Sequence, residues 1–256
     1  MERLALFDID CTLIDGHGAG GRAIMRAIKE VYGVEGELGD YSFHGRTDPG
    51  IVRDLADLWG AGDPEAVVGR YEGETQPQVV HDLAEQMGTP DDLIDALMDQ
   101  CVARYAELIA EEVGKVNIEV LPGVKELVTA LAADRRVLLG LLTGNVTEGA
   151  RVKLAPTGLS SLFRVAAYGS DSALRAELPA VAVVRAERLT GQRFAGKEIV
   201  VIGDTPADIE CGAGLGVKTI AVATGRHSLD ELAAHKPDHL FADMSDWRAV
   251  YEAILA

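Results

Sequence analysis

Hydrophobic residues in the second half of the chain form short runs that are separated by stretches of helical periodicity. Short apolar strands that alternate with helices are typical of βαβ units around a parallel sheet buried on both faces. We therefore predict an α/β fold. The predicted strands are residues 136–142, 163–169, 198–203, 217–224 and 239–244, joined by residues 3–7, and the predicted helices include residues 122–134, 178–189 and 228–235.

The segment from residue 16 to residue 118 has a different pattern, because helical periodicity runs through almost all of it. Its predicted helices are residues 20–33, 48–60, 78–88 and 89–114. The last of these begins with Thr89 in the capping position and Pro90, which together favour a helix start. We predict an all-helical cap domain of residues 16–118, inserted into an α/β core domain of residues 1–15 and 119–256.

Composition limits the partners that this chain can bind. A formal net charge of −17 opposes contact with nucleic acid or an anionic membrane, but not with a small anion beside a metal ion. No apolar run approaches the ~20 residues that cross a bilayer, and no signal peptide is visible. Cys11, Cys101 and Cys211 form no CxxC pair, which favours free thiols in a reducing compartment. We expect a cytoplasmic protein with a small-molecule partner, and the oligomeric state stays open.

Polar residues follow three of the predicted strands at the point where each strand ends. Asp8, Asp10 and Thr12 follow the first strand, Thr143, Gly144 and Asn145 follow residues 136–142, and Asp204 and Asp208 follow residues 198–203. In a parallel sheet the carboxyl ends of the strands meet at one edge, where ligands gather. Carboxylates at such an edge suit Mg²⁺, which is held by one or two carboxylates together with waters and substrate phosphate.

In this order and spacing, FDIDCTL, LLTGN and VIGDTPAD resemble motifs one, two and four of the haloacid dehalogenase-like hydrolase superfamily. The helical insertion after the first motif resembles the cap of the phosphoglycolate phosphatase and β-phosphoglucomutase branch. The resemblance implies a Rossmann-like doubly wound parallel sheet with an inserted helical cap. It also implies a Mg²⁺-dependent phosphatase that hydrolyses a small phosphorylated metabolite through an aspartyl-phosphate.

The resemblance further implies a role for each motif residue. Asp8 would be the nucleophile, and Asp10 would protonate the leaving oxygen and later deprotonate the attacking water. Mg²⁺ would be held by Asp8, Asp204 and the backbone carbonyl of Asp10, with Asp208 supporting the site from just outside. Thr143 and the amide of Gly144 would bind phosphate oxygens, and Asn145 is either part of this loop or a helix cap.

The family also expects a cation, usually lysine, before the fourth motif, and here the sequence departs from the pattern. That region contains Arg175 and no lysine, while Lys153 lies in the predicted helix after the second motif. Both stay open as the phosphate-neutralising cation. In the cap segment, His44 and Arg46 are candidates for substrate contact, although Arg46 could also be a surface charge. Cys11 stands where the family most often has glycine.

Two alternatives to a phosphatase remain open. A phosphomutase of the same superfamily uses the same nucleophile and acid/base pair, and it differs by excluding water from the phosphoenzyme. A non-catalytic phospho-aspartate switch also gathers acidic residues, a threonine and a lysine around Mg²⁺. In either enzyme, we expect the cap to open and close at joints near residues 15–21 and 117–122.

Overall fold

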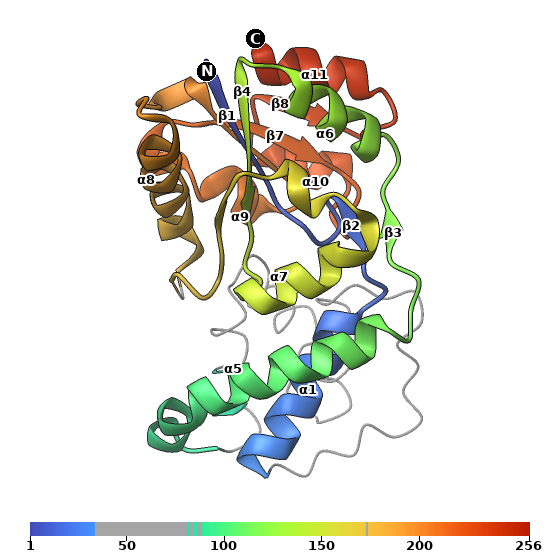
Figure 1. Ribbon diagram of the computed structural model, residues 1–256, viewed down its shortest axis with the longest axis vertical. Helices are drawn as coiled ribbons and strands as arrows, with labels where there is room; N and C mark the ends of the chain where they lie inside the picture. Colours follow the sequence, from blue (N-terminus) through green and yellow to red (C-terminus); the bar gives the residue numbers. More distant parts are fainter. Residues whose placement is uncertain (34–80, 82–83, 86–88, 173) are drawn as a thin grey trace.

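The computed structural model describes residues 1–33, 81, 84–85, 89–172 and 174–256 (Figure 1). Within them, six parallel strands form one sheet in the order β5-β4-β1-β6-β7-β8. The strands are β1 (Arg3–Phe7), β4 (Val137–Leu142), β5 (Val165–Ala167), β6 (Ile199–Gly203), β7 (Lys218–Val222) and β8 (His239–Phe241). Each lies inside a predicted run, and β5 and β8 are shorter than their runs.

Helices cover both faces of this sheet. Successive side chains of each strand point to opposite sides, so apolar residues of one strand pack against helices on both faces. Leu4 and Leu6 of β1 pack with α8 (Leu178–Thr190), while Ala5 and Phe7 pack with α6 (Val124–Ala133) and α11 (Trp247–Leu255). The remaining core helices are α7 (Thr147–Leu154), α9 (Pro206–Glu210) and α10 (Leu229–Ala234). The predicted α/β fold, a Rossmann-like doubly wound parallel sheet, is confirmed.

Two helices of the inserted segment lie at the end of the molecule opposite the chain termini (Figure 1). They are α1 (Ala19–Tyr32) and α5 (Asp91–Val113), which pack against each other, and α5 also contacts α7 of the core. The two chain segments that connect them to the core form a short antiparallel pair, β2 (Ile14–Asp15) and β3 (Glu119–Val120). The predicted domain boundaries fall at this pair of strands.

One predicted helix start was wrong by a residue or two. Pro90, and not Thr89, is the N-cap of α5, because an extended ψ of 142° leaves Pro90 outside the helix. The predicted helix of residues 48–60 and most of that of residues 78–88 lie outside the described residues. Among the helices that the structure describes, none is long and apolar enough to cross a membrane. Cys11, Cys101 and Cys211 are free thiols, as expected.

Candidate active site

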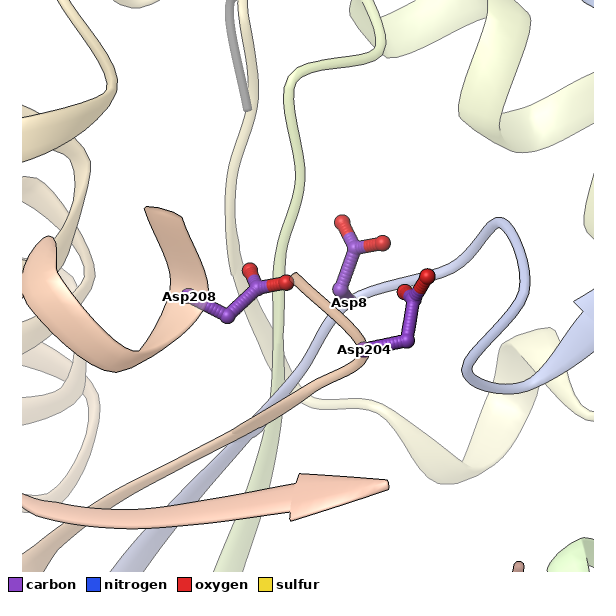
Figure 2. A group of neighbouring side chains, drawn as sticks. All are labelled: Asp8, Asp204 and Asp208. Carbon is purple, nitrogen blue, oxygen red and sulfur yellow. The ribbon is translucent and has the colours of Figure 1, made fainter. Parts of the chain in front are cut away.

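Three carboxylates meet at the carboxyl edge of the sheet, as Figure 2 shows. Asp8 follows β1, Asp204 follows β6, and Asp208 comes from the first turn of α9. All three are buried, and each offers an oxygen atom within 4.8 Å of the others. The order of the strands explains the encounter, because β1 and β6 are neighbours in the sheet although almost 200 residues apart in sequence.

The loop after β1 is fixed by backbone and side-chain hydrogen bonds. The amide of Asp8 donates to the carbonyl of Ile202 (2.9 Å), which continues the pairing of β1 with β6. The chain then turns at Cys11, whose φ of 56° lies in the left-handed region. Glycine adopts that conformation without strain, which explains why the family favours it at this position. The turn aims the hydroxyl of Thr12 at Asp204 Oδ1 (2.9 Å).

Asp208 combines a structural and a chemical role. It occupies the third position of α9, where its carboxylate accepts the amide of Thr205 (3.1 Å) in a capping box. Its other oxygen accepts a hydrogen bond from Arg175. Asp208 therefore stabilises the start of α9 and also contacts the cation of the acidic cluster. A Cβ at Gly203 would lie 2.1 Å from Asp208 Cγ, so this close packing requires glycine.

Arg175 is the cation that meets the buried carboxylates. Its Nη2 donates to Asp8 Oδ1 (3.2 Å) and to Asp208, and its side chain is 9% exposed. The buried Nε atom of Arg175 has no hydrogen-bond partner within the described part of the chain. An oxygen acceptor from a bound anion or a water would satisfy it.

Charge at this site is only partly balanced. Burial raises the pKa of Asp8 to about 7; Arg175 opposes that shift, and the neighbouring charges of Asp208 and Asp10 add to it. The pKa of Asp204 is raised as well, by burial first and then by the charges of Asp208 and Asp8. A divalent cation would offset this repulsion, and hard carboxylate oxygens are the donors that Mg²⁺ takes. The residues present therefore fit a Mg²⁺ ion.

Asp10 lies in a different environment from Asp8. Lys153 Nζ, from α7, donates to both oxygens of Asp10 at 2.8 Å. Asn145 Nδ2 donates to Asp10 Oδ2 (2.7 Å) and also to Thr143 Oγ1 (2.8 Å). Lys153 is buried at 1% exposure, whereas the side chain of Asp10 is 29% exposed. One face of the Asp10 carboxylate is thus bound to the protein, and another is open to a ligand.

The loop after β4 brings Thr143, Gly144 and Asn145 to the same edge of the sheet, and all three are buried. Of the two readings of Asn145, the structure excludes the helix cap. Val146 is the N-cap of α7, and Asn145 joins Asp10 to Thr143 instead. His44 and Arg46 lie outside the described residues.

The sequence analysis missed two residues of this site, Thr224 and Gly225, although the sequence contains a signal for them. Thr224 and Gly225 follow β7, the neighbour of β6, as polar and flexible residues at a fourth strand end. The hydroxyl of Thr224 donates to the carbonyl of Cys11 (2.5 Å). A Cβ at Gly225 would lie 1.9 Å from Asp204 Oδ2, so the chain passes this carboxylate where only glycine fits. Applying the strand-end rule to residues 217–224 would have pointed to both residues, but not to the steric need for glycine at residue 225.

Comparison with known proteins supports this reading of the motifs. A family model described as haloacid dehalogenase-like hydrolase matches residues 2–216. Phosphoglycolate phosphatase from Synechococcus elongatus is 26% identical over 146 residues, 56% of this chain and 66% of that protein. Pyrophosphatase PpaX from Bacillus pumilus is 29% identical over 120 residues, 47% of this chain and 54% of that protein. The matches thus span less than two thirds of either curated relative.

Solved structures with a similar fold also match this chain. A crystal structure described as a predicted phosphoglycolate phosphatase from Haemophilus somnus has a TM-score of 0.64 and 21% identity, and the match covers 98% of this chain and 97% of that one. The fold is that of a doubly wound α/β protein with buried carboxylates at the carboxyl edge of its sheet. The chain belongs to the haloacid dehalogenase-like hydrolase family, as its motifs indicated.

Proposed function

We propose that this protein is a Mg²⁺-dependent phosphatase that hydrolyses a small phosphomonoester. The observation that carries the proposal is that two neighbouring carboxylates, Asp8 and Asp10, lie in different surroundings. Asp8 lies in a buried acidic cluster beside Arg175, and Asp10 has one open face and is held by Lys153. Two carboxylates in such different surroundings suit different tasks, one as nucleophile and the other as acid and base.

The proposed chemistry has two steps. An oxygen of Asp8 attacks phosphorus and the P–O ester bond breaks, while the proton of Asp10 passes to the ester oxygen and releases an alcohol. Water then attacks the aspartyl-phosphate, its proton passes to Asp10, and the bond from phosphorus to Asp8 breaks. The products are an alcohol, inorganic phosphate and the original enzyme.

The remaining site residues take supporting roles in this proposal. Arg175, Thr143, Gly144 and Asn145 surround the phosphoryl group, and the buried Nε of Arg175 supports an anion beside it. Mg²⁺ would be held by Asp8, Asp204 and the carbonyl of Asp10, with Asp208 behind them. When bound, the ion neutralises charge on the phosphoryl oxygens.

The substrate is proposed at the level of its class. The names of the two curated relatives make phosphoglycolate and pyrophosphate the first compounds to test, followed by sugar phosphates. A net charge of −17 supports a small metabolite over a nucleic acid or a membrane surface, and the free thiols support a cytoplasmic location. We also propose that His44 and Arg46 contact the part of the substrate beyond the phosphate.

Release of inorganic phosphate tests the proposal. We expect p-nitrophenyl phosphate to be hydrolysed with Mg²⁺ and not after EDTA treatment, and at least one compound of the panel to be hydrolysed faster. A long-lived phospho-aspartate without turnover would instead identify a switch. Transfer of phosphate between positions of a sugar, without net release, would identify a phosphomutase.

A further inference from the structure

The two buried cations of the site contact different carboxylates. Arg175 meets Asp8 and Asp208, whereas Lys153 donates to both oxygens of Asp10 at 2.8 Å. Burying an ammonium group is unfavourable unless a partner compensates its lost hydration. Lys153 is 1% exposed, so its contact with Asp10 is a partly buried ion pair and not an incidental pair on the surface.

Helix α7 holds Lys153 in place from two sides. Ala150 and Leu154 of this helix belong to the hydrophobic cluster of the core sheet. Val152 packs against the cluster of α1 and α5, and Val146, the N-cap of α7, is part of that cluster. A helix packed on two sides has little freedom to shift, so the ammonium group has a defined position against Asp10.

We propose that Lys153 is a positioning residue for Asp10: it fixes the orientation of this carboxyl group and stabilises the carboxylate that forms when the leaving oxygen takes its proton. The inference rests on the proposed phosphatase function and deepens it, because it assigns the second cation to the leaving group and not to the phosphoryl group. Asn145, which donates to Asp10 Oδ2 at 2.7 Å, assists from the same side.

The proposal predicts a dependence on the leaving group. When the ester P–O bond breaks, a poor leaving oxygen needs the proton of Asp10, whereas p-nitrophenolate leaves with little help. Loss of Lys153 weakens proton donation, so it penalises poor leaving groups more. A cation that acts on the phosphoryl group would affect all substrates alike, because the phosphoryl group is common to them.

Substituted phenyl phosphates test this prediction, because they differ in leaving-group acidity and hardly in shape. For Lys153→Met we expect kcat/KM to fall about 100-fold with phenyl phosphate, at the lower end of the 10²–10⁴-fold range of acid–base catalysis, but only about 10-fold with p-nitrophenyl phosphate. The value of kcat/KM is used because it reports formation of the phosphoenzyme and not its hydrolysis. For Arg175→Met, equal losses on both substrates are expected.

Arg151→Met is the matched control, because Arg151 lies on the same helix, is exposed and pairs with Glu148. It is expected to change neither substrate's kcat/KM. Should Lys153→Met fail to fold, Lys153→Gln carries the same comparison, and thermal melting separates loss of structure from loss of function.

A double-mutant cycle makes the test specific for Asp10. In an Asp10→Asn background, Lys153→Met is expected to lower kcat/KM for p-nitrophenyl phosphate less than about twofold, since the group it acts on has gone. Equal losses across the substituted series, or losses that multiply in the cycle, would overturn the inference. Absence of turnover by the unaltered protein would instead contradict the proposed function itself.

Discussion

Buried acidic side chains occur both in the helical insertion and at the sheet edge, and the two regions balance their charge in opposite ways. In the insertion, Glu112 of α5 accepts hydrogen bonds from Arg22 and Arg26 (both 2.8 Å) and from Lys115 (2.6 Å). Burial alone would raise the pKa of Glu112, but these hydrogen bonds outweigh it and lower that pKa. One carboxylate thus meets three cations.

At the sheet edge, carboxylates outnumber the cations that contact them within the described residues. Asp8, Asp204 and Asp208 are buried together, and Arg175 is the cation that the structure places among them within the described residues. The pKa values of Asp8 and Asp204 are raised as a result of burial and mutual repulsion. An ion pair that serves the fold is balanced within the protein. A surplus of buried charge points to a partner from outside, which in the proposed function is a metal ion and a phosphate.

Among the variants that test this comparison, Asp8→Asn is expected to lose the most activity. Removing the nucleophile should lower kcat at least about 1,000-fold, because a residue that forms the covalent intermediate has no substitute. The same change should raise the melting temperature of the metal-free protein, because it removes one of three crowded charges. A variant that lost activity and stability together would show that Asp8 serves the fold.

A smaller loss is expected for Gly225→Ala. Its Cβ would lie 1.9 Å from Asp204 Oδ2, so the carboxylate must move, and a displacement of about 1 Å can cost about 100-fold in rate. Gly214→Ala is the control, because no atom lies within 4 Å of the Cβ position there. Kinetics of phosphate release compare the two. Equal activity of both variants would mean that the position of Asp204 is not critical.

Substitutions at Glu112 in the helical insertion should lower the stability of the fold and leave the reaction rate unchanged. Glu112→Gln leaves three cations without their carboxylate and is expected to cost about 1–3 kcal/mol in the free energy of unfolding. Glu111→Gln is the matched neighbour: it removes an exposed partner of Arg26 and should change stability by less than about 1 kcal/mol. Urea unfolding measures both variants, and a larger cost at Glu111 would contradict the balance described for Glu112.

The effect of Mg²⁺ on melting should be the smallest, and it should depend on pH because it arises in the acidic region alone. Asp8 and Asp204 have raised pKa values in the folded state, so the folded protein binds more protons than the unfolded chain. Stability of the metal-free protein should therefore fall as pH rises from about 4 through about 7. In the proposed site Mg²⁺ would bind the ionised carboxylates, so it should counteract this loss.

Thermal melting with and without Mg²⁺ measures the difference. We expect the ion to raise the melting temperature by a few degrees at pH 8 and by less at pH 5. Asp8→Asn should reduce the shift, whereas Glu112→Gln should leave it unchanged. A shift of equal size at both pH values would argue against binding at these carboxylates.

The sequence predicted which acids meet at the sheet edge, because parallel strands align their carboxyl ends and each motif directly follows a strand. It could not predict which cation contacts which carboxylate. Arg175 lies in the short turn before α8 and Lys153 in the last turn of α7. The packing of α7 against α5 and the sheet directs Lys153 to Asp10. The steric need for Gly225 depends on a contact between residues from different strands, which no local pattern contains.

The pairing of β2 with β3 has a consequence for how such a protein can diversify. Because Asp15 and Glu119 are register partners, the chain leaves the core and returns to it at neighbouring points. Insertions between these points can lengthen, shorten or change sequence without displacing the strands that carry Asp8 and Asp204. Evolution can therefore exchange the inserted segment while the carboxylates at the sheet edge are inherited intact.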